Sequence, residues 1–220
     1  MSSGVERPGV FIVFEGGEGV GKSTVVRYLS DYLRSCGNKV ILTREPGGTD
    51  LAEELREIIL RDESSGISAL QELFLFSAAR EDHLRKVVKP ALDEGYVVLC
   101  DRFIGSTYVY QGIVGGVDLD FLVETQKPFL DIVSISRTYV LDLDVDIALS
   151  RVSTDGVRDV NRIDLAGKEF HERIRRGYKN FASGDSGKLF NATLVDASPS
   201  PDIIVRNIVS DLVEVEGVLV

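Results

Sequence analysis

A glycine-rich loop between an apolar segment and a helical pattern constrains this chain more than any other feature. Residues 11–15 read Phe-Ile-Val-Phe-Glu, and residues 16–24 continue as Gly-Gly-Glu-Gly-Val-Gly-Lys-Ser-Thr. This is the G-x-x-x-x-G-K-S spacing of a phosphate-binding loop, in the strand-to-helix context that the motif requires. Glycines let backbone N–H groups turn toward an anion, and the helix N-terminus adds partial positive charge. The residues expected to bind a nucleoside triphosphate are Gly16, Gly17, Glu18, Gly19, Val20, Gly21, Lys22, Ser23 and Thr24.

Two side chains of this loop have specific expected roles. We expect Lys22 to reach the β- and γ-phosphates and the Ser23 hydroxyl to be a ligand of Mg²⁺. The loop does not identify the protein, because GTPases, motor ATPases and small-molecule kinases all carry it. A GTPase would also need an Asn-Lys-x-Asp segment, whereas the Asn-Lys pair at 38–39 is followed by Val-Ile.

Short apolar runs alternate with longer helix-periodic stretches along the chain. The runs are continuously apolar, which is typical of strands that are covered on both faces of a parallel sheet. The sequence therefore predicts an α/β fold of the P-loop NTPase type: one domain over residues 1–220, with a five-stranded parallel sheet flanked by helices. The predicted strands are 10–14, 39–43, 96–100, 138–143 and 193–195. The predicted helices are 22–35, 51–61, 68–93, 118–126, 144–153, 164–181 and 201–213.

Composition and charge narrow the range of partners. The net charge of −10 argues against a nucleic-acid groove, although a local basic pocket on an acidic protein can still bind a small anion. No stretch reaches the ~18 apolar residues of a membrane span, and residues 1–8 do not resemble a signal peptide. Cys36 and Cys100 have no spacing that suggests a bridge or a metal site, and they point to a reducing compartment. We therefore expect a cytoplasmic protein without nucleic-acid or membrane partners.

A polar stretch interrupts the alternation of strands and helices. Residues 153–161 read Ser-Thr-Asp-Gly-Val-Arg-Asp-Val-Asn and have no apolar period. One interpretation is a solvated loop between two helices. The other is a short mobile lid over the phosphates, spanning approximately residues 151–163.

Charged residues at two predicted strand ends indicate an acceptor pocket, since ligands of such sheets bind at the carboxyl ends of the strands. Arg44 stands beside the rigid Pro46 and suits a planar phosphate contact, or is an ordinary surface residue. Asp101 stands where a Walker-B carboxylate would hold Mg²⁺ through water, together with Ser23. Arg102 could clamp a second phosphate. An ion pair between Asp101 and Arg102 is not expected, because adjacent strand side chains point to opposite faces.

The predicted helix 68–93 carries a potential base-binding pair. Phe76 and Arg80 are four residues apart and share a helix face, which puts an aromatic plane beside a bidentate donor. Such a pair could stack on a base and hydrogen-bond its carbonyl. Taken alone, the pattern favours a core Phe and a solvated Arg over a base-binding pair.

Five segments together resemble thymidylate kinases, in that family's order and over nearly the whole chain. They are 14–16 (Phe-Glu-Gly), 44–48 (Arg-Glu-Pro-Gly-Gly), 76–80 (Phe-Ser-Ala-Ala-Arg), 101–103 (Asp-Arg-Phe) and 106–112 (Ser-Thr-Tyr-Val-Tyr-Gln-Gly). The resemblance implies Mg²⁺-dependent transfer of a phosphoryl group from ATP to dTMP, giving dTDP, in a cytoplasmic homodimer.

The resemblance also implies roles for individual residues. Phe76 would stack on thymine, and Arg80 would bind a thymine carbonyl. Arg44 and Arg102 would hold the dTMP phosphate, and Glu18 would face the acceptor sugar. The other expected dTMP-binding residues are Pro46, Ser106, Tyr110 and Gln111.

The family's catalytic arginine is expected in the lid of this chain. One branch of the family carries it in the phosphate loop, but Val20 stands there, as in the bacterial type. A lid arginine that stabilises transition-state charge is worth roughly 10³ or more in rate in comparable systems. The candidates are Arg151, Arg158 and Arg162, with Arg158 favoured because it lies mid-loop and Arg162 second. The residues expected to act in catalysis are Glu18, Lys22, Arg102, Arg158 and Arg162.

The expected reaction is direct in-line transfer without a covalent intermediate. A dTMP phosphate oxygen is already anionic, so no general base is needed. A nucleoside kinase on the same scaffold would need a carboxylate base and would not need two acceptor-phosphate arginines. Another nucleoside monophosphate kinase is the nearest alternative, and a nucleotide-switched interaction protein is an alternative from another class.

Overall fold

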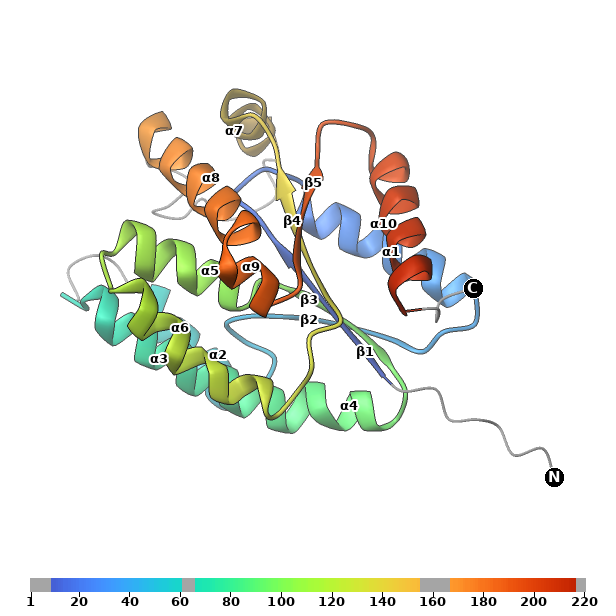
Figure 1. Cartoon of the computed structure of the whole chain (residues 1–220), viewed down its shortest axis with the longest axis horizontal. Helices are drawn as coiled ribbons and strands as arrows, with labels where there is room; N and C mark the ends of the chain where they lie inside the picture. Colours follow the sequence, from blue (N-terminus) through green and yellow to red (C-terminus); the bar gives the residue numbers. More distant parts are fainter. Residues whose placement is uncertain (1–8, 61–65, 155–166, 217–220) are drawn as a thin grey trace.

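A five-stranded parallel sheet forms the centre of the computed structural model, which describes residues 9–60, 66–154 and 167–216 (Figure 1). The strand order is β2-β3-β1-β4-β5, with β1 in the middle. The strands are β1 (Val10–Glu15), β2 (Val40–Arg44), β3 (Val97–Asp101), β4 (Arg137–Asp142) and β5 (Ala192–Asp196). The predicted fold class is confirmed, and each strand boundary lies within one residue of its prediction.

Helices cover both faces of the sheet, as the continuous apolar runs predicted. Alternate residues of β1 point to opposite faces, so Ile12 and Phe14 enter one core and Phe11 and Val13 enter the other. The first core is closed by α1 (Lys22–Ser35) and α10 (Pro201–Glu216). The second is closed by α3 (Ala69–His83), α6 (Leu119–Leu130) and α8 (Lys168–Ser183).

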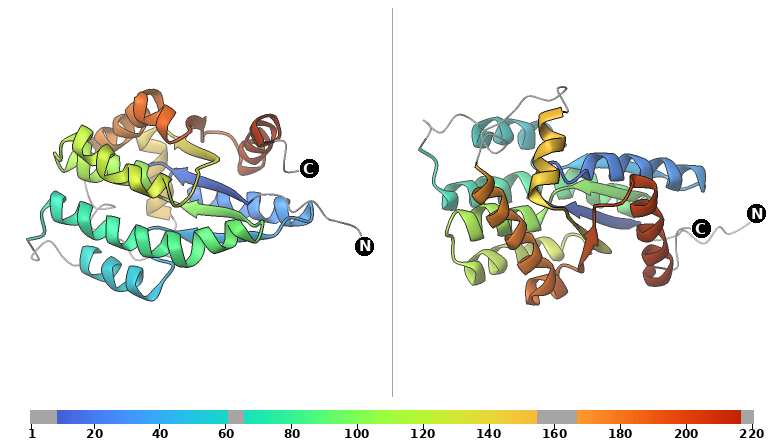
Figure 2. Two further views of the ribbon diagram at one scale, coloured as in Figure 1. Left: turned by 60° about the horizontal axis from the view of Figure 1, so that its bottom comes forward. Right: turned by 90° about the horizontal axis from the view of Figure 1, so that it is seen from above.

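Two further helices lie at the margins of these layers. Helix α2 (Asp50–Leu60) packs on α3 and lies outside it, away from the sheet (Figure 2). Helix α7 (Val145–Thr154) follows β4 and packs against α8. Within the residues placed by the structure, no helix is long and apolar enough to cross a membrane.

The helical region between β2 and β3 differs in detail from the prediction of one helix over 68–93. Helix α3 begins after Ser68, whose side chain forms a reciprocal capping box with Gln71. The backbone then passes through a π-helical segment, η2 (Leu84–Val88), into α4 (Lys89–Asp93). The helical pattern is therefore continuous, but its hydrogen-bond register changes after His83.

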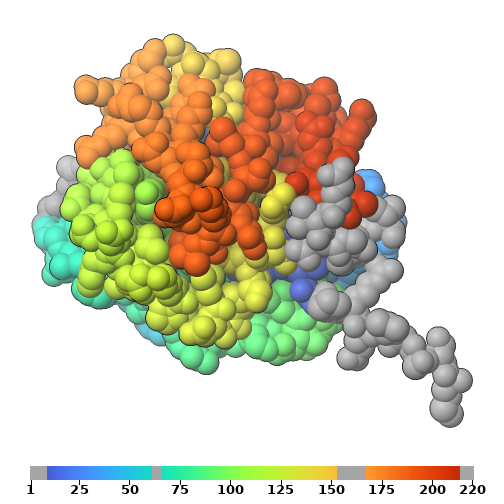
Figure 3. All heavy atoms as spheres, viewed as in Figure 1, coloured from blue at the N-terminus to red at the C-terminus, as the bar shows by residue number. Residues whose placement is uncertain are grey.

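Two short helical regions were not predicted. Helix α5 (Ile104–Thr107) continues into the π-helical segment η3 (Tyr108–Val114), and α9 (Asp185–Leu189) follows α8. The first region is rich in glycine, β-branched and aromatic residues, which have weak helix propensity, so tertiary contacts must hold it in place. Residues of η3, α6 and α8 make up much of one molecular face (Figure 3).

The carboxyl edge of the sheet is charged on every strand. The strands end in Glu15, Arg44, Asp101, Asp142 and Asp196. The chain reverses its direction of progress across the sheet at β1, which is the position where parallel α/β sheets open a crevice for ligands.

Candidate active site

The phosphate loop links β1 to α1 at this crevice. Gly21 is the N-cap of α1 in a left-handed conformation, and no side chain caps the helix, so its first N–H groups face the loop. Lys22 curls back over the loop, and its Nζ donates to the carbonyl oxygens of Gly16 and Gly17 at 2.9 Å each. Gly19 has a φ of +73°, and a Cβ there would lie 2.2 Å from the carbonyl oxygen of Ala148. The loop therefore has the closed, glycine-dependent shape that surrounds a phosphate.

Burial and charge affect the lysine of this loop. Burial lowers the pKa of Lys22, and the positive charge of Arg102 lowers it further, whereas Glu18 and Asp101 oppose the shift. An ammonium group has three N–H donors, and the two carbonyls take two of them. The third can point toward a phosphate oxygen.

Ser23 and Asp101, the two residues expected to hold Mg²⁺, lie next to each other beside the loop. The Ser23 hydroxyl lies 3.3 Å from Oδ2 of Asp101. The other carboxylate oxygen, Oδ1, is buried and has no hydrogen-bond partner among the described residues. Hydroxyl and carboxylate oxygens are ligands that suit Mg²⁺, which is held by few protein groups when phosphates supply the rest. Within the described ranges, no group of three or more His, Cys, Asp and Glu side chains could hold a metal.

A cleft of about 660 Å³ opens next to the phosphate loop. This volume lies within the range of small-molecule sites, roughly 300–1,000 Å³. Glu18 lines the cleft at the end nearest the loop. Residues predicted to bind the acceptor that also line it are Pro46, Phe76, Arg80, Arg102, Ser106, Tyr110 and Gln111.

Arg102 stands where the cleft meets the phosphate loop. Its backbone is left-handed, with φ of 70°, which is uncommon for a residue with a side chain. Its Nη2 is ion-paired with Glu18, and its Nη1 reaches the carbonyl oxygen of Gly16 at 3.4 Å. The pairing between Asp101 and Arg102 that the sequence argued against does not occur. The guanidinium therefore joins the loop to the cleft.

Arg80 is buried, so of the two possibilities for this residue the solvated one is wrong. Its side chain is 1% exposed and donates to Glu45 at 2.7 Å, to Gln126 at 2.5 Å and to Thr107 at 3.1 Å. The guanidinium also lies over the ring of Phe103, 4.8 Å from its centroid. A five-donor guanidinium with three fixed contacts keeps donors for a ligand in the cleft.

Aromatic and amide side chains complete the cleft wall. Phe76 is half-buried and lines the cleft beside Arg80. Burial raises the pKa of Tyr110 to about 12. Its buried hydroxyl has no partner with good hydrogen-bond geometry among the described residues, although Arg102 lies near enough to oppose the rise in pKa. The amide Nε2 of Gln111 donates to Oε2 of Glu72 at 2.9 Å, which orients this side chain. These groups can contact a base and a sugar.

Arg44 lies away from the cleft wall. Its side chain is 56% exposed, and Nη2 donates to both carboxylate oxygens of Glu53. Among the residues that line the cleft in the described part of the chain, Arg44 is not present. Its contact with an acceptor phosphate stays a prediction.

Arg56 lines the cleft and was missed by the sequence analysis. Burial lowers its pKa, and the nearby positive charges of Arg44 and Arg102 lower it further, while Glu53 opposes the shift. These charges mark a basic region suited to an anion. One signal could have found it: Arg56 follows Ala52 by four residues and precedes Ile59 by three, so it lies on the buried face of its helix.

The proposed lid is only partly described. Arg158 and Arg162 lie outside the described residues. Arg151, the third candidate, is placed near the phosphate loop, since its Nη1 would lie 3.7 Å from a Cβ on Gly21.

Comparisons with known proteins agree on one family. The family model described as thymidylate kinase matches residues 14–208. A thymidylate kinase of Symbiobacterium thermophilum is 39% identical over 199 residues, covering 90% of each chain. One from Anoxybacillus flavithermus is 44% identical over 176 residues, covering 77% of this chain and 81% of its own. The crystal structure of thymidylate kinase from Ehrlichia chaffeensis superimposes with a TM-score of 0.72 at 29% identity, covering 94% of this chain and 100% of that one. The resemblance drawn from the five segments is confirmed.

Proposed function

This chain belongs to the thymidylate kinase family and is a phosphotransferase that makes dTDP from dTMP and ATP; from this premise we propose that the cleft beside its phosphate loop is the dTMP site. The observation that carries the assignment is the position of Arg102. Its guanidinium lies between the loop, through Gly16 and Glu18, and the cleft that Phe76 and Arg80 line. A monophosphate held by Arg102 would therefore face a triphosphate held by the loop.

In this proposal, thymine lies at the end of the cleft farthest from the loop. Phe76 stacks on the base, and Arg80 donates to a base carbonyl. Gln111 and the hydroxyl of Tyr110 contact the base and sugar, with Ser106 and Pro46 completing the wall. Glu18 faces the sugar while paired with Arg102.

The chemical task of these residues is to bring two polyanions together. An acceptor phosphate oxygen is already charged at neutral pH, so direct in-line attack needs no general base. Lys22 and Arg102 reduce the repulsion between the phosphates, and Arg56 adds a cation that the sequence analysis did not include. Holding donor and acceptor in line replaces a bimolecular encounter with an oriented one.

Mg²⁺ is proposed at Ser23 and Asp101, which fit a hard cation because one buried oxygen of Asp101 has no partner among the described residues. When bound, it supplies charge neutralisation at the β- and γ-phosphates. A catalytic arginine from the lid, Arg158 or Arg162, is also part of the proposal.

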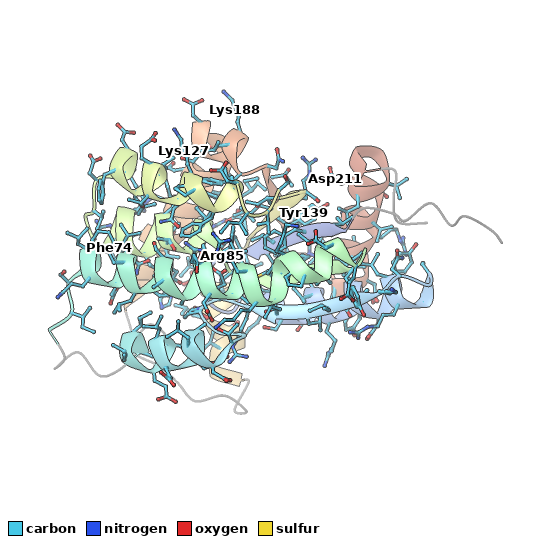
Figure 4. All side chains as sticks on the ribbon, turned by 90° about the horizontal axis from the view of Figure 1, so that it is seen from below. Phe74, Arg85, Lys127, Tyr139, Lys188 and Asp211 are labelled. Atoms are coloured by element: carbon cyan, nitrogen blue, oxygen red, sulfur yellow. The ribbon has the colours of Figure 1, made fainter. Side chains whose placement is uncertain are left out.

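We further propose a cytoplasmic homodimer that binds neither nucleic acid nor membrane. Large apolar side chains are exposed on two neighbouring helices: Leu70 and Phe74 of α3 at 44% and 52%, and Phe121 of α6 at 45%. Figure 4 shows Phe74 at the molecular surface. The charge of −10 supports the absence of a nucleic-acid partner.

The test is an ADP-release assay with ATP and Mg²⁺ against dTMP, dUMP, UMP, CMP, AMP and GMP. We expect the highest kcat/KM with dTMP. A Phe76→Ala variant should raise KM for dTMP roughly tenfold or more and leave KM for ATP unchanged, because base stacking is worth ~1–3 kcal/mol. A higher kcat/KM with another monophosphate would contradict the roles of Phe76 and Arg80 while leaving the phosphate loop assignment intact.

A further inference from the structure

Arg102 is held by two hydroxyl groups that come from different helices. Its Nη1 donates to the hydroxyl of Tyr178 on α8 at 3.1 Å and to Oγ of Ser106 on α5 at 3.2 Å. The two hydroxyl oxygens are 2.9 Å apart. Tyr178 is 2% exposed, so water does not compete for its hydroxyl. The orientation of the guanidinium therefore depends on this pair of hydroxyls.

The direction of these hydrogen bonds follows from the carboxylate at their far end. Ser106 lies 2.7 Å from Oε2 of Glu15, and a carboxylate accepts, so Ser106 donates its single proton there. The Ser106 oxygen must then accept the proton of Tyr178. The Tyr178 oxygen, having donated, accepts from Arg102. The chain of donors runs from Arg102 through Tyr178 and Ser106 to Glu15.

Glu15 fixes that chain to the core of the protein. Its Oε1 accepts from the backbone N–H groups of Phe103 and Ser106 at 2.8 and 2.9 Å, at the start of α5. A Cβ on Gly105 would lie 2.9 Å from the carboxylate carbon, so this glycine lets the helix approach Glu15 closely. Burial raises the pKa of Glu15, and the Ser106 hydroxyl and Arg102 oppose that rise by stabilising the carboxylate.

We propose that Tyr178 is a positioning residue for Arg102 and sets how firmly the acceptor phosphate is held. This inference rests on the proposed role of Arg102 as the dTMP phosphate clamp. The N–H groups of Nη1 are occupied by Tyr178, Ser106 and Gly16. The Nε–H group has no hydrogen-bond partner among the described residues, so it can donate to a phosphate. Holding one edge of a planar guanidinium fixes the direction of the others.

Tyr178→Phe removes one oxygen and keeps the ring, which packs edge-on against Tyr110 with centroids 6.4 Å apart. We expect dTMP to bind roughly tenfold more weakly, the usual size of one lost hydrogen bond to a charged group, with KM for ATP unchanged. The competitive inhibition constant of thymidine should not change, because thymidine has no 5′-phosphate for Arg102 to bind. If Tyr178 only stabilised the fold, Tyr178→Phe would weaken the binding of dTMP and thymidine to the same extent.

Tyr108→Phe is the matched control. Tyr108, the first residue of η3, is also a buried tyrosine that packs against α8, with its ring centroid 5.3 Å from that of Phe181. Its hydroxyl has no hydrogen-bond partner among the described residues. Tyr108→Phe should therefore bind dTMP and thymidine as the parent protein does.

Arg102→Lys separates this inference from the proposal on which it rests. It keeps the charge beside Glu18 but loses the planar fork, and it should weaken dTMP binding. When it is added to Arg102→Lys, Tyr178→Phe should cause no further loss of dTMP affinity. Suppose that Arg102→Lys weakens dTMP binding but Tyr178→Phe does not, or that Tyr178→Phe weakens thymidine binding as much as dTMP binding. The proposed role of Tyr178 is then wrong, and the role of Arg102 as the phosphate clamp stands. If Arg102→Lys leaves dTMP binding unchanged, the clamp is wrong and the role of Tyr178 falls with it.

Discussion

Two arginines that line the cleft, the buried Arg80 and the partly exposed Arg102, are oriented by side chains of the protein itself. Arg80 is held by Glu45, Gln126 and Thr107, and Arg102 by Glu18 and Tyr178 among others. Donors oriented before the substrate arrives do not have to be ordered during binding, so more of the interaction energy remains for recognition. At the scale of single residues, the site therefore depends on the partners of its arginines as much as on the arginines.

Glu45→Gln tests the partner of Arg80. The carboxylate is 4% exposed, accepts from Nε of Arg80 at 2.7 Å and also lies 3.1 Å from Nδ1 of His83. Removing its charge leaves a buried guanidinium without its counter-charge, so the free energy of unfolding should fall by about 3–5 kcal/mol. Urea denaturation measures this change. The exposed Glu94→Gln should alter stability by less than about 0.5 kcal/mol, and an equal effect of both variants would contradict the prediction.

Arg56→Ala tests the cation that the sequence analysis missed. Arg56 lines the cleft and donates to the carbonyl oxygen of Pro46 at 3.0 Å. If it contributes to the field around the acceptor phosphate, KM for dTMP should rise about tenfold, the effect of losing a charge-assisted contact. The exposed Arg27 of α1 offers a control, since Arg27→Ala should leave KM for dTMP unchanged. An unchanged KM in both variants would remove Arg56 from the site.

At the scale of elements, side chains from the strands fix the helices whose own sequences specify them weakly. Glu15 of β1 accepts hydrogen bonds from the backbone N–H groups of the N-cap residue and the third residue of α5. A carboxylate from a strand therefore caps the N-terminus of this helix. Asp211 of α10 accepts from Nε and Nη2 of Arg137 on β4 and from the hydroxyl of Tyr139. Figure 4 shows Tyr139 and Asp211 side by side.

The attachment of α10 should depend on pH. The hydrogen bonds from Arg137 lower the pKa of Asp211 below 3.8, its ordinary value, so the folded state holds the carboxylate in its charged form more strongly than the unfolded chain does. The stabilisation is fully present above that ordinary value and is lost as pH falls through the lower, folded-state pKa.

Asp211→Asn should therefore lower the free energy of unfolding by about 1–2 kcal/mol at pH 7, since a hydrogen bond to a charged group is worth about that much. The difference from the parent protein should shrink as the pH is lowered below 4. Urea midpoints between pH 7 and pH 3 measure it, with the exposed Asp31→Asn as the control. A difference that stayed constant over this range would show that the carboxylate's charge is not responsible.

At the scale of the whole molecule, three of the exposed large apolar side chains, Leu70, Phe74 and Phe121, lie on the neighbouring helices α3 and α6. Phe74 and Leu70 belong to α3, whose residues Phe76 and Arg80 line the cleft. A partner subunit that packs on α3 and α6 would therefore support the helix that carries the proposed base-binding pair.

Phe74→Asp should convert the proposed dimer to a monomer, because it places a charge in a surface that must lose its water on association. Size-exclusion chromatography with light scattering reports the mass directly. Ile203→Asp, at a residue 44% exposed on α10, should leave the mass unchanged. A monomeric parent protein would contradict the proposed dimer. A dimeric Phe74→Asp protein would show that the dimer interface does not include Phe74.

The sequence alone determined the strand framework, the phosphate loop and the family. Strands buried on both faces require unbroken apolar runs, and a phosphate loop requires glycines, lysine and serine at set intervals, so both are local in the chain. The short helices at 104–114 and 185–189 were not predicted, because glycine and β-branched residues favour no helix without tertiary support.

What only the tertiary structure decided was which charged side chains meet. Arg56 reaches the cleft and Arg44 pairs with Glu53 because of how α2 packs on the rest of the fold. Tyr178 meets Arg102 across 76 positions of sequence, and Glu15 meets Ser106 across 91. Such contacts leave no periodic or motif signal, since they depend on how separate elements pack together and not on the spacing of residues within one of them.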